Sequence, residues 1–181
     1  MTGPCISVIV PTHNNGEEIH RAIQTILSQD AIARGLCSVE IIVVNDASSE
    51  SYSENLQSIP YKYPACKLFH RSVQGGPAAA RNFGIRQATG EMISFLDADD
   101  EWPENKLSLL LPLFRNPELE VAGGKIKYIA DEGIPVVNMR YEDNQNRITH
   151  VHLGALLVRK SVFDKGFFFD ESLTFSEDID W

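Results

Sequence analysis

Several features that assign a sequence to a common class are scarce or absent here. The 181 residues include three cysteines, an odd number without a Cys-x-x-Cys pair, so we expect reduced, buried thiols and no disulfide framework. The apolar runs are too short for a secretory signal or a membrane span. Lysine and arginine number 16 against 25 aspartates and glutamates, a formal net charge of -9, which argues against nucleic-acid binding. An anionic ligand would need a local cation or a well-placed arginine.

Motifs with well-known chemistry are also missing. There is no phosphate-binding Gly-x-x-x-x-Gly-Lys-Ser/Thr loop, no Gly-x-Gly-x-x-Gly and no Gly-x-Ser-x-Gly nucleophile turn. His150 and His152 lie two residues apart, but no third histidine or cysteine is close to them in sequence. We therefore expect surface or core histidines and no zinc site.

Short apolar runs alternate with helix-like segments in the first part of the chain, and this pattern predicts one α/β domain with a mostly parallel sheet and helices on both faces. The expected strands are 6–10, 39–44, 67–70 and 92–96, and the expected helices are 17–29, 50–58, 77–89 with Gly90 as a stop signal, and 103 to about 114 with Pro103 as first residue. Further strands, which would pair antiparallel, are expected within 121–130, 135–140 and 148–158. The chain ends one turn into an expected helix that begins at Ser176, so we expect a piece of a longer domain.

In such sheets, ligands bind beyond the carboxyl ends of the parallel strands. The loop Pro11–Asn15, the residue Asp46 and the run Asp97–Asp100 each follow an apolar strand. We therefore expect all three polar clusters to open on the same crevice.

Asp97-Ala98-Asp99-Asp100 places three carboxylates within four residues, and these repel one another unless a cation compensates. In extended backbone the side chains of Asp97 and Asp99 would point the same way. Their oxygens suit Mg²⁺ or Mn²⁺, which bind through one or two carboxylates and substrate phosphates. The alternative is a solvated acidic turn before the next helix, and spacing alone does not separate the two.

Three other groups are weaker signals by themselves. Asp46-Ala47-Ser48-Ser49 is typical of a turn or a helix cap. The glycines of Gln74–Pro77 precede a helix whose N-terminus favours anions, and Arg81 lies about one turn into that helix. Arg81 would reach a diphosphate from there, or simply be a surface arginine. Glu177-Asp178 is typical of a first helical turn.

Taken together and in order, these segments resemble the family-2 glycosyltransferases of the GT-A fold. The resemblance is carried by the segments 7–14, 28–30, 40–48, 76–82, 90–100 and 169–171 together with Glu177-Asp178. Asn45 departs from it, because an aspartate is common there, but Asp46 keeps the neighbouring key position. The resemblance implies the GT-A nucleotide-diphospho-sugar transferase fold, with residues 1–115 as the nucleotide-sugar-binding half and residues 116–181 as the start of the acceptor-binding half.

The resemblance also implies roles for individual residues. A pocket for the nucleotide base would be lined by Pro11, Thr12 and His13, and Asp46 would accept a hydrogen bond from the base, usually uracil. Arg81 would sit near the diphosphate or the base. The donor and the metal would be held by Asp97-Ala98-Asp99, with Asp99 as the direct ligand of Mn²⁺ or Mg²⁺ and Asp97 beside it. Asp178 would be the general base.

The implied reaction moves a sugar from a nucleotide-diphosphate sugar, usually a UDP-sugar, to a saccharide or lipid-linked acceptor with inversion at the anomeric carbon. Such chemistry serves polysaccharide and cell-envelope synthesis. We expect a cytoplasmic protein, with a peripheral place at the inner face of the membrane, although no basic amphipathic face favours one. Two alternatives stay open. One is a nucleotidyltransferase with a similar sheet, although Thr12–Gly16 lacks the basic residues expected there. The other is a donor-binding module without turnover.

Overall fold

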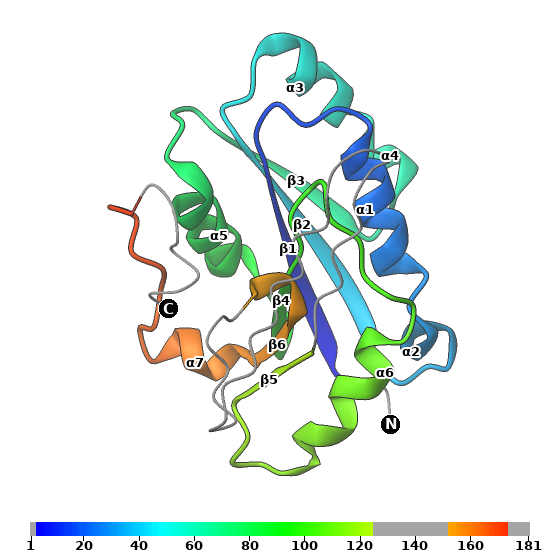
Figure 1. The fold of residues 1–181 in the computed structure, drawn as a ribbon. Coiled ribbons are helices and arrows are strands. Elements are labelled where there is room, and N and C mark those ends of the chain that lie inside the picture. Colours follow the sequence, from blue (N-terminus) through cyan, green and yellow to red (C-terminus); the bar gives the residue numbers. More distant parts are fainter. Residues whose placement is uncertain (1–2, 125–151, 174–181) are drawn as a thin grey trace, which may run out of the picture.

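The computed structural model describes residues 3–124 and 152–173, and in these residues six strands form one sheet in the order β3-β2-β1-β4-β6-β5 (Figure 1). The strands are β1 (Cys5–Thr12), β2 (Ser38–Asp46), β3 (Cys66–Arg71), β4 (Met92–Phe95), β5 (Val121–Gly123) and β6 (Leu156–Arg159). β1 to β4 run parallel, whereas β6 runs antiparallel to β4 and to β5. The predicted mostly parallel sheet is confirmed, and it ends in an antiparallel edge.

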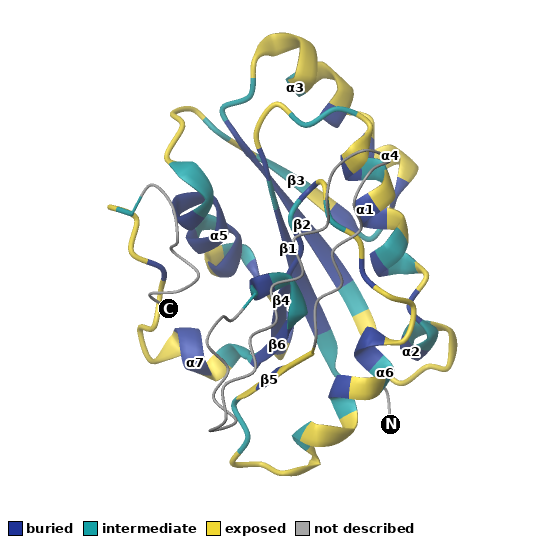
Figure 2. Ribbon diagram, in the orientation of Figure 1, coloured by how far each residue is buried: buried dark blue, intermediate teal, exposed yellow. Residues whose placement is uncertain are grey.

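Helices cover both faces of this sheet (Figure 1). The α-helices are α1 (Glu18–Leu27), α2 (Asp30–Ala33), α3 (Glu50–Leu56), α4 (Ile59–Lys62), α5 (Gly76–Gln87), α6 (Lys106–Leu110) and α7 (Lys160–Asp164); the 3-10 helices are η1 (Leu111–Arg115) and η2 (Leu153–Ala155). α1 and α6 pack on one face, and α5 and α7 pack on the other. Figure 2 shows the central strands buried between them and the outer helix surfaces exposed.

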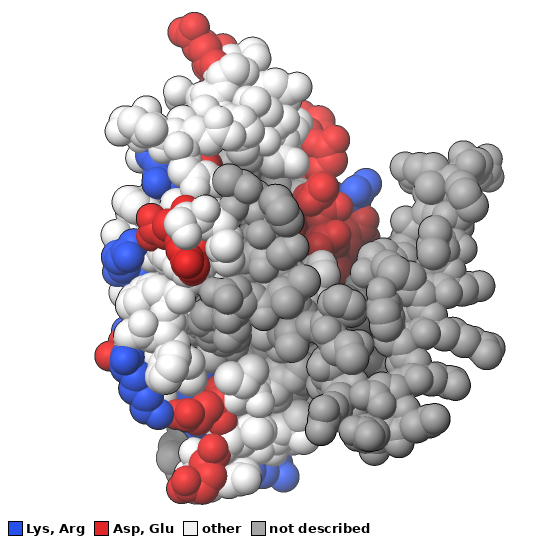
Figure 3. All heavy atoms as spheres, turned by 60° about the vertical axis from the view of Figure 1, so that its left-hand side comes forward, with Lys and Arg blue, Asp and Glu red and all other residues white. Residues whose placement is uncertain are grey.

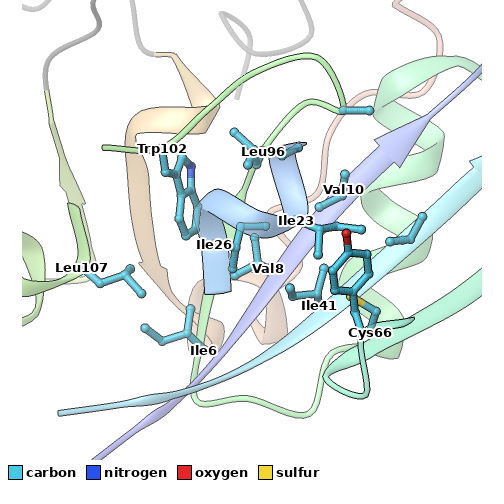
Figure 4. Close-up of a cluster of buried hydrophobic side chains, with 14 of the residues drawn as sticks. Ile6, Val8, Val10, Ile23, Ile26, Ile41, Cys66, Leu96, Trp102 and Leu107 are labelled. Carbon is cyan, nitrogen blue, oxygen red and sulfur yellow. The ribbon is translucent and has the colours of Figure 1, made fainter. Parts of the chain in front are cut away.

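The central strands read as continuous apolar runs because both of their faces are covered. Successive side chains point to opposite faces, so Ile6, Val8 and Val10 join the cluster under α1, while Ile9 joins the cluster under α5. The first cluster is drawn in Figure 4, where Ile23 and Ile26 of α1 meet the strand residues, and Trp102 and Leu107 close one end. Cys66 lies in the same cluster. All three cysteines are free, as expected, and burial raises the pKa of Cys66 to about 12.

Small residues let α5 lie close to the sheet. A Cβ added at Gly84 would come within 2.5 Å of Ile9 Cγ2, and Ala78 and Ala80 are fully buried on the same side. The predicted role of Gly90 as a helix stop is wrong, because α5 already ends at Gln87. Gly90 is instead required by packing, since a Cβ there would meet the Cys5 carbonyl oxygen at 2.7 Å.

The helix expected to begin at Pro103 begins at Lys106 instead and becomes a 3-10 helix at Leu111, before Pro112. Contacts from Gln29 explain the late start. Its amide Nε2 donates a hydrogen bond to the Pro103 carbonyl at 2.8 Å, and its Oε1 accepts from Leu107 N–H at 3.0 Å. Tertiary hydrogen bonds therefore hold residues 103–105 out of the helix, and the same glutamine lies beyond the end of α1 instead of inside it.

The less regular second part of the chain agrees with its prediction only in places. Of the strand expected within 121–130, the described residues contain β5 from Val121 to Gly123, and residues 125–130 lie outside the described part. Of the strand expected within 148–158, residues 148–151 lie outside the described part, η2 comes next, and β6 follows from Leu156. The antiparallel pairing of β5 and β6 was expected. The segments 135–140 and 176–181 lie outside the described residues. In the part of the chain that is described, no helix has the length and apolar character needed to cross a membrane.

Candidate functional site

The carboxyl ends of β1, β2 and β4 bring the predicted residues to one edge of the sheet. Thr12 pairs in register with Asn45, so Asp46 lies beside His13. Phe95 pairs with Ile9, and Leu96 N–H donates to the Ile9 carbonyl at 3.1 Å, so Asp97 follows at the level of Pro11. Three segments that are far apart in sequence therefore share the edge where ligands of such sheets bind.

The loops after β1 and β2 are joined to each other by hydrogen bonds. The ring Nδ1 of His13 lies 2.8 Å from the Asp46 carbonyl oxygen. Asn14, at a positive φ of 55°, receives the Ser49 N–H on its Oδ1 at 2.9 Å and donates its own N–H to Ser48 Oγ at 2.9 Å. His13 is exposed and Thr12 is buried. The sequence did not reveal that Asn14 joins these two loops, although asparagine is among the residues that tolerate a left-handed conformation.

Asp46 is almost fully buried and serves as the anchor of the loop between β3 and α5. Its carboxylate accepts hydrogen bonds from Gly76 N–H at 2.7 Å and Gly75 N–H at 3.1 Å, and it forms an ion pair with Arg71. Gly76 has a φ of 80°, and a side chain on Gly75 would meet the Arg71 guanidinium. The glycine loop is thus shaped around this carboxylate.

Arg71 is a site residue that the sequence did not single out. It pairs in register with Asp46 across β2 and β3, and its side chain is only 20% exposed. The available signal was its position at the end of a third parallel strand, which opens on the same edge as the other two.

Arg81 is buried in α5 and is not a surface arginine. Its Nη2 donates to Asp97 Oδ1 at 2.6 Å, with 5% of the arginine side chain and 39% of the aspartate side chain exposed. The guanidinium therefore binds one oxygen of Asp97, the first carboxylate of the acidic run, and leaves part of that side chain exposed to solvent.

The next residue of α5, Asn82, holds the segment that follows α7. Its amide exchanges two hydrogen bonds with the Phe169 backbone, at 2.9 and 3.0 Å, and donates a third to Glu171 Oε1 at 2.9 Å. Two consecutive residues of one helix thus reach the acidic run and the segment that leads toward Glu177-Asp178. Asp178 itself lies outside the described residues.

The acidic run is a turn, and the expectation of extended backbone at Asp97–Asp99 is wrong. β4 ends at Phe95, and Asp100 N–H donates back to the Asp97 carbonyl at 3.0 Å. Ala98 is buried inside the turn, while Asp99 is exposed. Any convergence of Asp97 and Asp99 on one ion therefore depends on the turn and not on strand geometry.

The surroundings of Asp100 in this turn raise the pKa of its carboxyl group. Burial raises the pKa of Asp100, and the charges of Asp97 and Asp99 raise it further, against a lowering by His152. His152 Nε2 lies 3.9 Å from Asp100 Oδ2. Among the residues described, no set of three or more histidine, cysteine or acidic side chains forms a ready metal cage. The exposed carboxylate oxygens fit a cation that keeps other ligands, as Mg²⁺ and Mn²⁺ do.

This edge defines an α/β protein with a candidate ligand site beyond its parallel strands. The chain belongs to glycosyl transferase family 2, because the family model of that description matches residues 7–167, and its fold is the GT-A fold. S. aureus TarS 1–349 in complex with UDP-GlcNAc has a TM-score of 0.76 and 25% identity to this chain, covering 96% of this chain and 51% of that one.

Two curated relatives are similar over parts of their length. The minor teichoic acid biosynthesis protein GgaA of Bacillus subtilis (strain 168) is 27% identical over 184 residues, covering 95% of this chain and 41% of GgaA. The GalNAc(5)-diNAcBac-PP-undecaprenol beta-1,3-glucosyltransferase of Campylobacter jejuni subsp. jejuni serotype O:2 (strain ATCC 700819 / NCTC 11168) is 33% identical over 140 residues, covering 72% of this chain and 44% of that enzyme. The chain spans less than half the length of these two relatives.

Proposed function

We propose that this chain binds a nucleotide-diphosphate sugar, with UDP as the nucleotide, and supplies the donor side of an inverting, metal-assisted glycosyltransferase. The observation that carries the proposal is the Asp97–Asp100 turn, held by Arg81 at an edge shared with His13 and Asp46. In this proposal residues 1–115 are the donor-binding half and residues 116–181 begin the acceptor-binding half. The UDP-GlcNAc complex of TarS supports UDP as the nucleotide.

The charges at this edge support the proposed role of a cation. Arg71 is paired with Asp46 and Arg81 is paired with Asp97, so neither guanidinium offers a full positive charge to a diphosphate. Asp99 and Asp100 add negative charge, which would repel the donor. Mn²⁺ or Mg²⁺ bound by Asp99, with Asp97 beside it, would neutralise the diphosphate as leaving group.

The base of the nucleotide would lie against Pro11, Thr12 and His13. Asp46 is proposed to accept a hydrogen bond from the base, and that bond would have to share a carboxylate that already accepts from Arg71, Gly75 and Gly76. We therefore give Asp46 a double role, in which it shapes the glycine loop and also accepts a hydrogen bond from the base. Ala98 would contact the donor through its backbone.

The transfer step is assigned to Asp178 as general base. Its carboxylate would take the proton of the acceptor hydroxyl while the acceptor oxygen bonds to the anomeric carbon. The bond from that carbon to the diphosphate oxygen breaks, and its electron pair leaves with the diphosphate. Attack from the side opposite the leaving group inverts the configuration.

The acceptor is proposed to be a saccharide or a lipid-linked glycan. This rests on the two curated relatives, one named for minor teichoic acid biosynthesis and one for a glycan on PP-undecaprenol. A lipid-linked acceptor would place the protein in the cytoplasm at the inner face of the membrane.

Calorimetric titration with UDP, in Mn²⁺ and in EDTA, tests the donor and metal assignments. We expect binding in Mn²⁺ that EDTA weakens strongly, and Asp99→Ala should remove the effect of Mn²⁺. The control is Asp164→Ala on α7, an exposed carboxylate that pairs with Lys160 and should change nothing. Equal binding of UDP in Mn²⁺ and in EDTA would contradict the metal assignment.

In a longer form of the protein, Asp178→Asn should bind UDP normally and lose turnover.

A further inference from the structure

Lys106, the first residue of α6, is a buried amine with an unusual set of partners. Only 7% of the residue is exposed. Its Nζ donates to Ser94 Oγ at 2.8 Å and to the Leu156 carbonyl at 3.2 Å, and it lies 3.5 Å from the centre of the Trp102 ring. These described partners carry no formal charge, and burial lowers the pKa of Lys106 well below its usual value.

The amine lies where the backbone pairing between β4 and β6 stops. The ladder joins Met92 to Arg159 and Ile93 to Val158 and goes no further. At the next residue, Ser94, side-chain hydrogen bonds replace the backbone pairing. The Ser94 hydroxyl donates to the Leu156 carbonyl, and the Lys106 amine donates to the Ser94 hydroxyl and to the Leu156 carbonyl. On its other side β4 stays paired with β1 as far as Leu96. The β6 side of this strand end is therefore held through Ser94 and Lys106.

The same amine contacts both sides of the acidic turn. Ser94 lies three residues before Asp97, and Trp102 lies two residues after Asp100. Trp102 is also fixed to α1, because its backbone N–H donates to Thr25 Oγ1 at 3.1 Å. Lys106 thus connects the entry and the exit of the turn to the start of β6.

Leu156, whose carbonyl binds Lys106, belongs to the segment His152–Leu156, which approaches the acidic turn. It directly follows η2, and η2 follows His152, whose ring approaches Asp100. A shift at Leu156 would therefore move His152 relative to the carboxylates of the turn.

An apolar side chain would fill the same space without the cost of desolvating an amine, so a buried lysine here needs a reason other than stability. We propose that Lys106 is a positioning residue that sets the Asp97–Asp100 turn against the His152–Leu156 segment and so fixes the geometry in which donor and metal bind. The inference rests on the proposed function, and it concerns a residue that would not touch the donor.

The first test is UDP affinity in Mn²⁺ for Lys106→Met, which keeps the length and apolar stem of the side chain. We expect affinity to fall about 10- to 100-fold, as for other groups that orient metal ligands. Glu40→Gln is the matched control: Glu40 is a buried, hydrogen-bonded carboxylate at the opposite end of the strands, so its loss should lower stability and leave UDP affinity unchanged. Unchanged affinity in Lys106→Met, with UDP bound normally by the wild type, contradicts the positioning role. An equal loss of affinity in Glu40→Gln contradicts it too.

A second measurement needs no nucleotide. Backbone amide NMR shifts of Asp99, Asp100 and Gly154 should change in Lys106→Met and not in Glu40→Gln. Ser94→Ala, a smaller change that removes one partner of the amine, should move the same signals in the same direction and replaces Lys106→Met if that variant does not fold. Unmoved signals would overturn the inference even if the wild type binds UDP. Moved signals in a protein that binds no nucleotide would support the positioning of the turn by Lys106 and would overturn the proposed function instead.

Discussion

Glu40 shows at the scale of one residue how a buried charge can be purely structural. It lies in β2, and its Oε1 accepts hydrogen bonds from Ser7 Oγ at 2.6 Å and from Thr89 N–H at 2.6 Å, while Lys67 Nζ donates to its Oε2 at 2.7 Å. Gly90 N–H approaches the same carboxylate at 3.1 Å. Burial raises the pKa of Glu40, but these hydrogen bonds outweigh it and lower the pKa to about 2.

This carboxylate predicts a specific acid sensitivity. The folded-state pKa lies below the ordinary value of 4.5, so the charged form stabilises the fold above about pH 4.5, and that stability is lost as the pH falls toward 2. The contribution is about 3 kcal/mol at neutral pH, from 1.36 kcal/mol for each pKa unit. Urea unfolding as a function of pH should show a steeper loss between pH 4.5 and 2 for the wild type than for Glu40→Gln. Parallel curves would show that Glu40 is not the group responsible.

Single residues were predicted from the sequence when they stand next to a strand end, and missed when their partners lie far away in the chain. Asp46 and Asp97 lie at the predicted edge of the sheet, because each comes at the end of an apolar run. Arg71 and Lys106 were missed because their roles depend on partners that only the folded sheet brings near, 25 residues away for Arg71 and 50 residues away for the Leu156 carbonyl bound by Lys106.

At the scale of elements, α5 joins the Asp97–Asp100 turn to the segment after α7. Arg81 reaches Asp97, and Asn82 holds the Phe169 backbone and Glu171. Asn82 is 1% exposed, so its loss would leave buried backbone groups of Phe169 without their partners, which costs about 1–3 kcal/mol for each group.

Asn82→Ala should therefore loosen the segment 167–173 more than the sheet. We expect a lower free energy of unfolding, by about 2 kcal/mol, and faster amide hydrogen exchange at Phe169 than in the wild type. Exchange at the β1 amides should change only by as much as global stability does. The control is Asn55→Ala on the exposed surface of α3, which should leave both measurements unchanged. Protection at Phe169 that survives in Asn82→Ala would contradict this account of α5.

Elements were predicted well where one physical signal dominated. The β-branched runs of β1 and β2 gave the sheet, and the helical spacing of Ile19, Ile23 and Ile26 gave α1. Boundaries failed where tertiary hydrogen bonds compete with local preference. Pro103 suits a first helical position, yet Gln29 holds its carbonyl, and the Asp97–Asp100 run closes into a turn that its sequence does not distinguish from an extended strand end.

At the scale of the whole molecule, the net negative charge opposes the binding of an anionic ligand at this edge, and the proposed cation would offset it. The net charge is -9, and acidic side chains gather in a patch on the face shown in Figure 3. The site's two arginines are already paired with aspartates. The family was recognisable from the sequence because several weak motifs occur in the right order, whereas the sugar, the acceptor and the role of each site residue depend on geometry that no single motif carries.

The measurement that tests the central claim most directly is diffraction from crystals grown with UDP and Mn²⁺, recorded at the manganese absorption edge. We predict one anomalous peak about 2.1 Å from an Asp99 carboxylate oxygen, with the UDP diphosphate bound to the same ion and the uracil against His13 and Asp46. A manganese peak remote from the acidic turn, or UDP bound at another edge of the sheet, would contradict the account.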